Sequence, residues 1–288
     1  MRAWAGASAC IFVLLLASSS IPVAGWSNGG YSADPDNPDY GTHDWIADKA
    51  LSIQTRDATF LKTTYHSEYL LGTEAPDNPE YIGDSTNHHV YYYSGGSMQD
   101  DVCADRAKAM YDLALPRLVA GDYSVAANYI GAMAHYISDV GVFGHTMGAY
   151  TDWGVEVHHS DYESEFEDFI GTLTLPSGTA LGDSSAYDAT MALARTITFG
   201  SGSIKPNVWM DTNYDWVDDV FDTSAKASLY KSASAVAAAI NRLLGAAQPT
   251  PPEEPDPEDP EPDEPVPDEP VSVVPDPPAS LSAYVDGS

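Results

Sequence analysis

Hydrophobic residues recur at the spacing of a helix through most of the chain between residues 42 and 246. In the segment 42–56, Ile46, Ala50 and Ile53 share one face behind Thr42, a residue type suited to begin a helix. Similar patterns predict helices at 57–71, 101–120, 122–143, 159–172, 184–199 and 223–246. The alternating pattern of a strand is scarce, and the segment 88–95 is the exception, expected to be extended. The pattern therefore predicts an all-α fold.

The first 25 residues lack this helical pattern. They carry Arg2, then an apolar run from Ala9 to Ala17, then small residues, which is typical of a secretory signal peptide and too short for a stable membrane span. Cleavage is expected before Trp26, with cleavage after Ala24 or at Ala17 as the alternatives. We therefore expect an exported protein, either secreted or held at the cell surface.

The other end differs from the helical part in composition. Residues 249–288 contain twelve acidic residues, no Lys or Arg, and thirteen of the 21 prolines in the chain. A segment of this kind cannot bury a core, so we expect a disordered, extended acidic tail. Residues 26–248 remain as a single multi-helix domain, large enough for a substantial core.

The net charge and the cysteine content argue against some kinds of binding partner and against an internal disulfide. The net charge of −31 divides into −12 for residues 249–288 and −19 for the rest of the chain. Such a surface opposes stable binding to nucleic acid and to anionic membranes. Of the two cysteines, Cys10 lies in the predicted signal peptide and Cys103 alone remains in the domain. Without an internal disulfide, an exported domain needs another source of stabilisation.

Histidine and carboxylate residues gather in the stretches 135–145 and 159–163. His135 and Asp139 are four residues apart, as are His159 and Glu163, so each pair shares one face of a predicted helix. One such pair is usually a hydrogen-bonded core group. Two pairs with His145 between them, in a chain with twelve Lys and Arg, favour a metal centre instead. Imidazole and carboxylate groups suit zinc.

Five features in a fixed order resemble the zinc-dependent phospholipase C family, to which the alpha-toxin-type bacterial enzymes belong. They are Trp26 at the expected mature N-terminus, "THDWIADKAL" (42–51), "APDNPEYIGDSTNHHVY" (75–91), "HYISDVGVFGH" (135–145) and "HSDYE" (159–163). In the third of these, a twelve-residue separation from Asp77 favours His89 over His88. The sequence departs from the family at Phe143, where members often have proline, and the acidic tail stands where the toxins carry a membrane-binding domain.

The resemblance implies a trinuclear zinc site. One ion would be held by Asp77, His89, His135 and Asp139, a second by His145, His159 and Glu163, and a third by the main-chain groups of Trp26 with His43 and the shared Asp139. It also implies hydrolysis of phospholipids by a zinc-activated water, with release of diacylglycerol and a phosphorylated headgroup. Asp77 is the expected general base. We expect a monomer that takes a phospholipid or other phosphodiester substrate and contacts membranes transiently.

Two alternatives stay open at this point. A single-strand-specific zinc nuclease of the same superfamily would share Trp26 and the His/Asp scaffold. Glu163, where those nucleases typically have Asp, and the net negative charge argue against it. A non-catalytic, zinc-stabilised surface binding protein is favoured by the stalk-like tail, and Asp77 argues against it.

The acidic stretch 211–222 is a weaker candidate, for calcium. It places carboxylate and amide groups at the loop positions of an EF-hand, namely Asp211, Asn213, Asp215, Asp219 and Asp222. Trp216 stands where that loop requires Gly, and its last position is Asp rather than Glu. A solvated acidic loop is the favoured interpretation.

Overall fold

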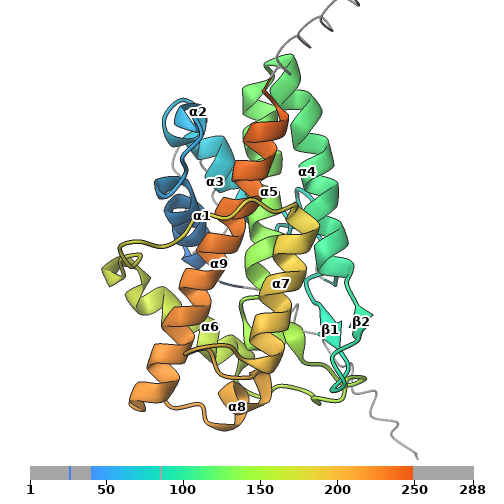
Figure 1. The fold of residues 1–288 in the computed structure, drawn as a ribbon, viewed down its shortest axis with the longest axis vertical. Coiled ribbons are helices and arrows are strands. Elements are labelled where there is room, and N and C mark those ends of the chain that lie inside the picture. Colours follow the sequence, from blue (N-terminus) through green and yellow to red (C-terminus); the bar gives the residue numbers. More distant parts are fainter. Residues whose placement is uncertain (1–25, 27–39, 85, 249–288) are drawn as a thin grey trace, which may run out of the picture. The chain divides into compact units, whose positions relative to one another are not determined.

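A computed structural model describes Trp26 and residues 40–84 and 86–248. The predicted signal peptide and the predicted acidic tail lie outside the described residues, so both stay predictions. The helices are α1 Thr42–Ser52, α2 Thr59–Lys62, α3 His66–Glu74, α4 Val102–Ala120, α5 Tyr123–Asp139, α6 His159–Phe169, α7 Ala186–Phe199, α8 Asn207–Thr212 and α9 Asp219–Ala246, with 3₁₀ turns η1 Phe143–Thr146 and η2 Ile170–Thr172. Strands β1 Tyr91–Tyr92 and β2 Met98–Asp100 form a small antiparallel pair. The predicted all-α fold is confirmed (Figure 1).

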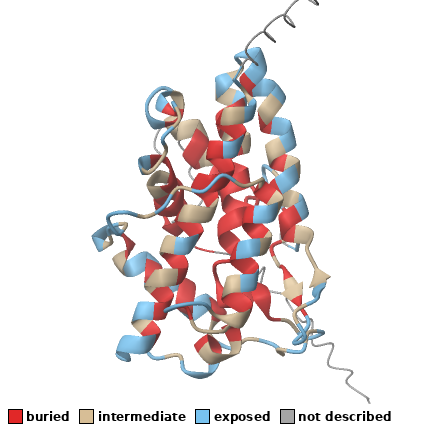
Figure 2. Ribbon diagram, viewed as in Figure 1, coloured by how far each residue is buried: buried red, intermediate tan, exposed pale blue. Residues whose placement is uncertain are grey.

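Helix α5 is the central element of the helical domain. It packs against α1, α3, α4, α7 and α9, and every residue from Ile130 to Asp139 is buried (Figures 1 and 2). Its last three turns are rich in Ala, Gly and Ile, and they are apolar on all sides, as expected for a helix surrounded by others. His135 and Asp139 are the charged-type residues of this stretch, so α5 carries them into the core.

Two glycines allow α3 and α5 to pack backbone against backbone. A Cβ atom at Gly131 would overlap the carbonyl oxygen of Tyr69, and one at Gly72 would overlap the carbonyl of Asn128. Only residues without a Cβ permit this approach. It brings the carbonyl oxygen of Thr73 within 2.6 Å of His135 Nδ1.

Helix α5 ends at Asp139 rather than at residue 143, where the hydrophobic pattern predicted its end. After Asp139 the chain turns at Gly141, whose missing Cβ leaves room for the Ser232 hydroxyl of α9. The 3₁₀ turn η1 follows and directs His145 back toward the end of α5. A single apolar segment thus folds as a helix and a turn, and Gly141 permits the close approach of α9 at the turn.

Other boundaries differ from the prediction as well, and α1 ends at Ser52 rather than at residue 56. The segment 57–71 forms the short α2 and then α3, with a break around Thr63. Helix α9 begins four residues earlier than predicted because the Asp218 carboxylate accepts hydrogen bonds from the backbone N–H groups of Val220 and Phe221, at 2.7 and 3.1 Å. Among the described helices, none has the length and apolar character needed to cross a membrane.

Candidate metal centre

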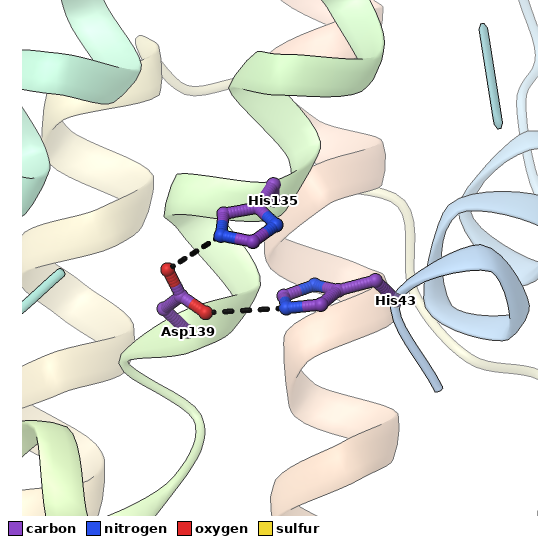
Figure 3. Close-up of side chains that lie close together, drawn as sticks. All are labelled: His43, His135 and Asp139. Carbon is purple, nitrogen blue, oxygen red and sulfur yellow. Dashed lines mark ion pairs between the residues drawn. The ribbon is translucent and has the colours of Figure 1, made fainter. Parts of the chain in front are cut away.

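Asp139, the last residue of α5, is the hub of a buried polar cluster. Its Oδ1 lies 3.2 Å from Nε2 of His43, which comes from α1, and its Oδ2 lies 3.2 Å from Nε2 of His135, one turn earlier on α5 (Figure 3). Nδ1 of His88 lies 2.6 Å from the same Oδ2. Asp77 Oδ1 is 3.7 Å from Nε2 of both His88 and His135. These five residues are called the Asp139 cluster below.

The second ring nitrogen of each histidine in the Asp139 cluster faces a neutral oxygen. His43 Nδ1 lies 2.9 Å from the Ser138 hydroxyl, and His135 Nδ1 donates to the carbonyl oxygen of Thr73 at 2.6 Å. His88 Nε2 contacts the carbonyl oxygen of Asp84. These contacts fix the ring orientations, so that one nitrogen of each ring is directed at Asp139.

The prediction of His89 as a member of this cluster is wrong, because His88 occupies the position. His89 is directed to the other side of the segment, where it stacks on Tyr91 and its Nε2 lies 3.4 Å from Asp100 Oδ2. Successive side chains of an extended segment point to opposite sides. His88, Val90 and Tyr92 are buried, so His88 shares the inner side with the apolar Val90.

A second cluster, called the Glu163 cluster below, consists of His145, His159 and Glu163. His159 and Glu163 are four residues apart on α6, and His145 comes from η1. Glu163 Oε1 lies 2.6 Å from His159 Nε2 and 3.7 Å from His145 Nε2. Gly144 faces the His159 ring so closely that a Cβ atom there would lie 2.5 Å from its Cγ. The sequence prediction of these three residues as one group agrees with the geometry.

Trp26 lies beside the end of α5, between the two clusters and α6. Its side chain is fully buried against Tyr162 and Phe166, and its Nε1 donates to the carbonyl oxygen of Ser138 at 2.8 Å. The Ser138 hydroxyl in turn contacts His43. The indole is thus linked to the Asp139 cluster through Ser138. The predicted role of its main-chain groups as metal ligands stays a prediction.

The side chains of both clusters fit a metal centre. Among the described residues, several fully buried atoms of the two clusters lie 2.6–3.7 Å from an ionisable partner without forming a hydrogen bond of ordinary geometry: His43 Nε2, Asp139 Oδ1, His145 Nε2, His159 Nε2 and Glu163 Oε1. Leaving such atoms unsatisfied costs free energy. Three groups of ligand-type atoms converge, formed by His43, His135 and Asp139, by Asp77, His88 and His135, and by His145, His159 and Glu163. Nitrogen and oxygen ligands in this combination suit zinc.

A cavity of about 420 Å³ opens beside these clusters. His88 of the Asp139 cluster and His145 of the Glu163 cluster both line it. Tyr91 and Glu156 line it too, with the main chain around Gly148. A ligand in this cavity therefore reaches both groups of metal-ligand side chains.

Comparison with known proteins identifies the family. The family model described as zinc dependent phospholipase C matches residues 42–227, more than half of the chain. The chain belongs to the zinc-dependent phospholipase C family. No curated protein shows a significant match to the sequence.

Solved structures that are similar to this chain include two alpha toxins. The alpha toxin of Clostridium absonum has a TM-score of 0.51 and 16% identity, over 72% of this chain and 64% of the toxin chain. The alpha-toxin of Clostridium perfringens from an avian strain has a TM-score of 0.48 and 17% identity, over 78% of this chain and 65% of the toxin chain. This chain thus spans less than two thirds of either toxin, and at these identities the likeness concerns the fold. The resemblance predicted from the sequence motifs is confirmed by the family match, and the zinc dependence of the family agrees with the ligand-type atoms of both clusters.

Burial shifts the pKa of every group in this phospholipase C family centre that is named here, and neighbouring charges reverse some of these shifts. It lowers the pKa of His43 to about 4, with the neighbouring His135 adding to the effect, and it lowers the pKa of His145 well below 6.5. Burial also raises the pKa of Glu163 to about 8, although the His159 imidazole opposes the shift. For Asp139, burial is outweighed by the imidazoles of His135 and His88, and its pKa lies well below 3.8. Burial also lowers the pKa of His88 and His159, but the neighbouring carboxylates outweigh it and raise these pKa values to about 9 and about 10.

The stretch 211–222 has no convergent calcium site in the structure. Asp211 is buried, and its Oδ1 accepts hydrogen bonds from the backbone N–H groups of Val157 and His158. Asp218 caps α9, and Asp222 pairs with Lys226 four residues later. The carboxylates therefore act as separate caps and ion-pair partners.

One residue within the Asp139 cluster and one beside the Glu163 cluster were not predicted from the sequence. His88 is identifiable from the alternation of inner and outer side chains in "HHVYYY", because the apolar Val90 sets which side faces the core. Glu156 lies 3.5 Å from His159 Nδ1 and precedes α6, so helical spacing gives no signal for it.

Proposed function

We propose that this protein is a phospholipase C-type phosphoric diester hydrolase that cleaves phospholipids into diacylglycerol and a phosphorylated headgroup. Family membership supports the reaction type. The observation that carries the proposal is the set of buried nitrogen and oxygen atoms that converge from Asp139, Glu163 and their histidine neighbours next to a cavity of about 420 Å³.

The residues that would hold three zinc ions follow from the two clusters. One set is Asp77, His88, His135 and Asp139; another is His145, His159 and Glu163; the third is His43 and Asp139 with the main-chain groups of Trp26. When bound, zinc supplies positive charge that stabilises a phosphodiester transition state and lowers the pKa of a water molecule toward neutrality. The buried Trp26 indole beside Ser138 supports the placement of that residue close to His43.

Asp77 is proposed as the general base. Its carboxylate lies 3.7 Å from the nearest nitrogens of His88 and His135. These rings hold it at the edge of the Asp139 cluster, on the segment that also leads to the cavity wall. A carboxylate in that position can accept the proton of an attacking water.

The two ends of the chain and its net charge support a proposal for where this reaction takes place. We infer an exported, monomeric enzyme that meets its substrate at membrane surfaces through transient contacts, with residues 1–25 as the signal peptide and residues 249–288 as an acidic, disordered tail. The net charge of −31 supports a zwitterionic lipid surface over an anionic one and opposes nucleic acid as a substrate.

The test uses the mature form beginning at Trp26 and its Asp77→Asn variant. Wild type is expected to cleave a chromogenic phosphorylcholine ester and to leave single-stranded DNA intact. The variant should lose about 10²- to 10⁴-fold in turnover, the usual contribution of a general base, while its circular dichroism stays that of wild type. Asp105→Asn, which changes an exposed carboxylate on α4, serves as the matched control. Unchanged turnover in Asp77→Asn would remove this residue from the mechanism, and cleavage of DNA alone would replace the proposed substrate.

A further inference from the structure

His159 differs from the histidines of the Asp139 cluster in its outer contact. His43, His88 and His135 each face a neutral hydroxyl or carbonyl oxygen through the second ring nitrogen. His159 instead faces a carboxylate, since its Nδ1 lies 3.5 Å from Glu156 Oε1. Its Nε2, on the other side of the ring, is directed at Glu163.

The segment that carries Glu156 is anchored to Asp211. The next two backbone N–H groups, those of Val157 and His158, donate to the buried Asp211 carboxylate at 2.9 and 3.0 Å. Glu156 itself is 19% exposed on its side chain and lines the cavity. It is therefore fixed by its backbone neighbours, at the rim of the Glu163 cluster.

A carboxylate behind a ligating imidazole has a known physical effect. It fixes the tautomer that leaves the other nitrogen free for a metal, it orients the ring, and it makes that nitrogen more basic. Removing such a partner weakens metal binding by about 10- to 100-fold.

We propose that Glu156 is a positioning residue that keeps His159 Nε2 directed at a zinc ion in the Glu163 cluster and strengthens zinc binding there. The inference rests on the proposed zinc centre. Glu156 contacts the outer nitrogen of His159 and lies outside the convergent group of His145, His159 and Glu163, so its role is to orient a ligand.

The experiment measures zinc retention rather than turnover. Wild type, Glu156→Ala, Glu156→Gln and the control Glu165→Gln are titrated with a zinc chelator, and the zinc left on each chain is determined by elemental analysis. Glu165 is exposed on α6, so its variant removes the same charge close by without touching His159. We expect Glu156→Ala to release one zinc ion at about 10- to 100-fold lower chelator activity than wild type. Glu156→Gln should lie in between, because an amide oxygen still accepts from Nδ1–H but carries no charge, and Glu165→Gln should match wild type.

The outcomes separate this inference from the proposed function. If wild type holds zinc and both Glu156 variants retain it as tightly, the role of Glu156 is overturned while the proposed function stands. If wild type holds no zinc, the role of Glu156 and the proposed function are both contradicted. A purely structural role would lower the unfolding temperature equally with and without chelator, whereas the proposed role lowers it in the zinc-loaded protein alone. Should Glu156→Ala not fold, Glu156→Gln decides, since retention equal to wild type contradicts the proposal.

Discussion

The Asp139 cluster and the Glu163 cluster lie next to each other but are built in different ways. The first joins residues from α1, from the segment 77–88 and from α5, which are distant in sequence and meet because helices pack around α5. The second takes its residues from η1 and α6, within a short stretch of chain. Its outer carboxylate, Glu156, lies at the cavity, whereas the outer partners of the Asp139 cluster are neutral oxygens.

This difference predicts which kind of substitution should disturb each cluster. The Asp139 cluster depends on tertiary packing, so a change in helix approach should disturb it from a distance. The Glu163 cluster depends on local turns, so a change there should leave the helical core intact. Four substitutions test the contrast, from the largest expected effect to the smallest.

Asp139→Ala should have the largest effect. This carboxylate contacts three histidines in the core, and removing one partner from a buried group of charges costs about 3–5 kcal/mol of unfolding free energy. Activity should disappear together with zinc from the Asp139 cluster. Denaturant unfolding and elemental analysis measure the two effects. A stable variant with all of its zinc would show that Asp139 is not the hub.

Gly131→Ala tests the packing between α3 and α5. The added Cβ would overlap the Tyr69 carbonyl, and such overpacking costs about 1–3 kcal/mol. Separation of the helices should also pull Thr73 away from His135 and weaken the Asp139 cluster. Gly171→Ala is the matched control, because its Cβ would meet no atom within 4 Å. Equal unfolding free energies for both variants would contradict the close approach.

Gly144→Ala tests the second cluster. Its Cβ would lie 2.5 Å from Cγ of His159, so the ring must move and zinc binding by the Glu163 cluster should weaken by about 10-fold or more, as for a lost supporting contact. The unfolding free energy of the metal-free protein should change by less than in Gly131→Ala. The contrast between the clusters fails if this variant retains zinc fully or is the less stable of the two.

Arg106→Ala tests the outer support of His88 and gives the smallest effect. Arg106 Nε lies 2.6 Å from Asp84 Oδ2, and the carbonyl of Asp84 contacts His88. Because Arg106 is 41% exposed, the expected loss is about 1 kcal/mol. Burial raises the pKa of Asp84, but Arg106, Asn87, His88 and Tyr136 together outweigh burial, and the pKa lies below 3.8.

The sign of the pH dependence follows from that shift. A depressed pKa stabilises the fold above pH 3.8, and this contribution is lost as the pH falls through the lower, folded-state value. The gap in unfolding free energy between wild type and Arg106→Ala should therefore be full at pH 7 and shrink below about pH 4. Chelator is added at both pH values, so that zinc release does not contribute to the comparison. A difference in unfolding free energy that does not change with pH would contradict the ion pair.

The sequence predicted the helices well where apolar periodicity decides them, as in α4 and α7. It misplaced the end of α5, because the apolar pattern continues past Asp139 while the chain turns at Gly141, whose missing Cβ leaves room for Ser232, a residue distant in sequence. It also placed the start of α9 too late, since the cap by Asp218 falls in a stretch whose acidic residues suggested a loop.

The residues of the candidate site also divide into those that the sequence predicted and those that it did not. His135, Asp139, His159 and Glu163 follow from i, i+4 spacing. The choice between His88 and His89 depends on which side of an extended segment faces the core, and residue counting from Asp77 gave the wrong one. Glu156 has no periodic signal, because its contact with His159 arises from a turn held by Asp211.

The zinc content of the mature protein beginning at Trp26 tests the central claim most directly. Elemental analysis of the purified chain should give close to three zinc ions per molecule, as the proposed ligand sets predict. A zinc content near zero in a correctly folded protein would contradict the account.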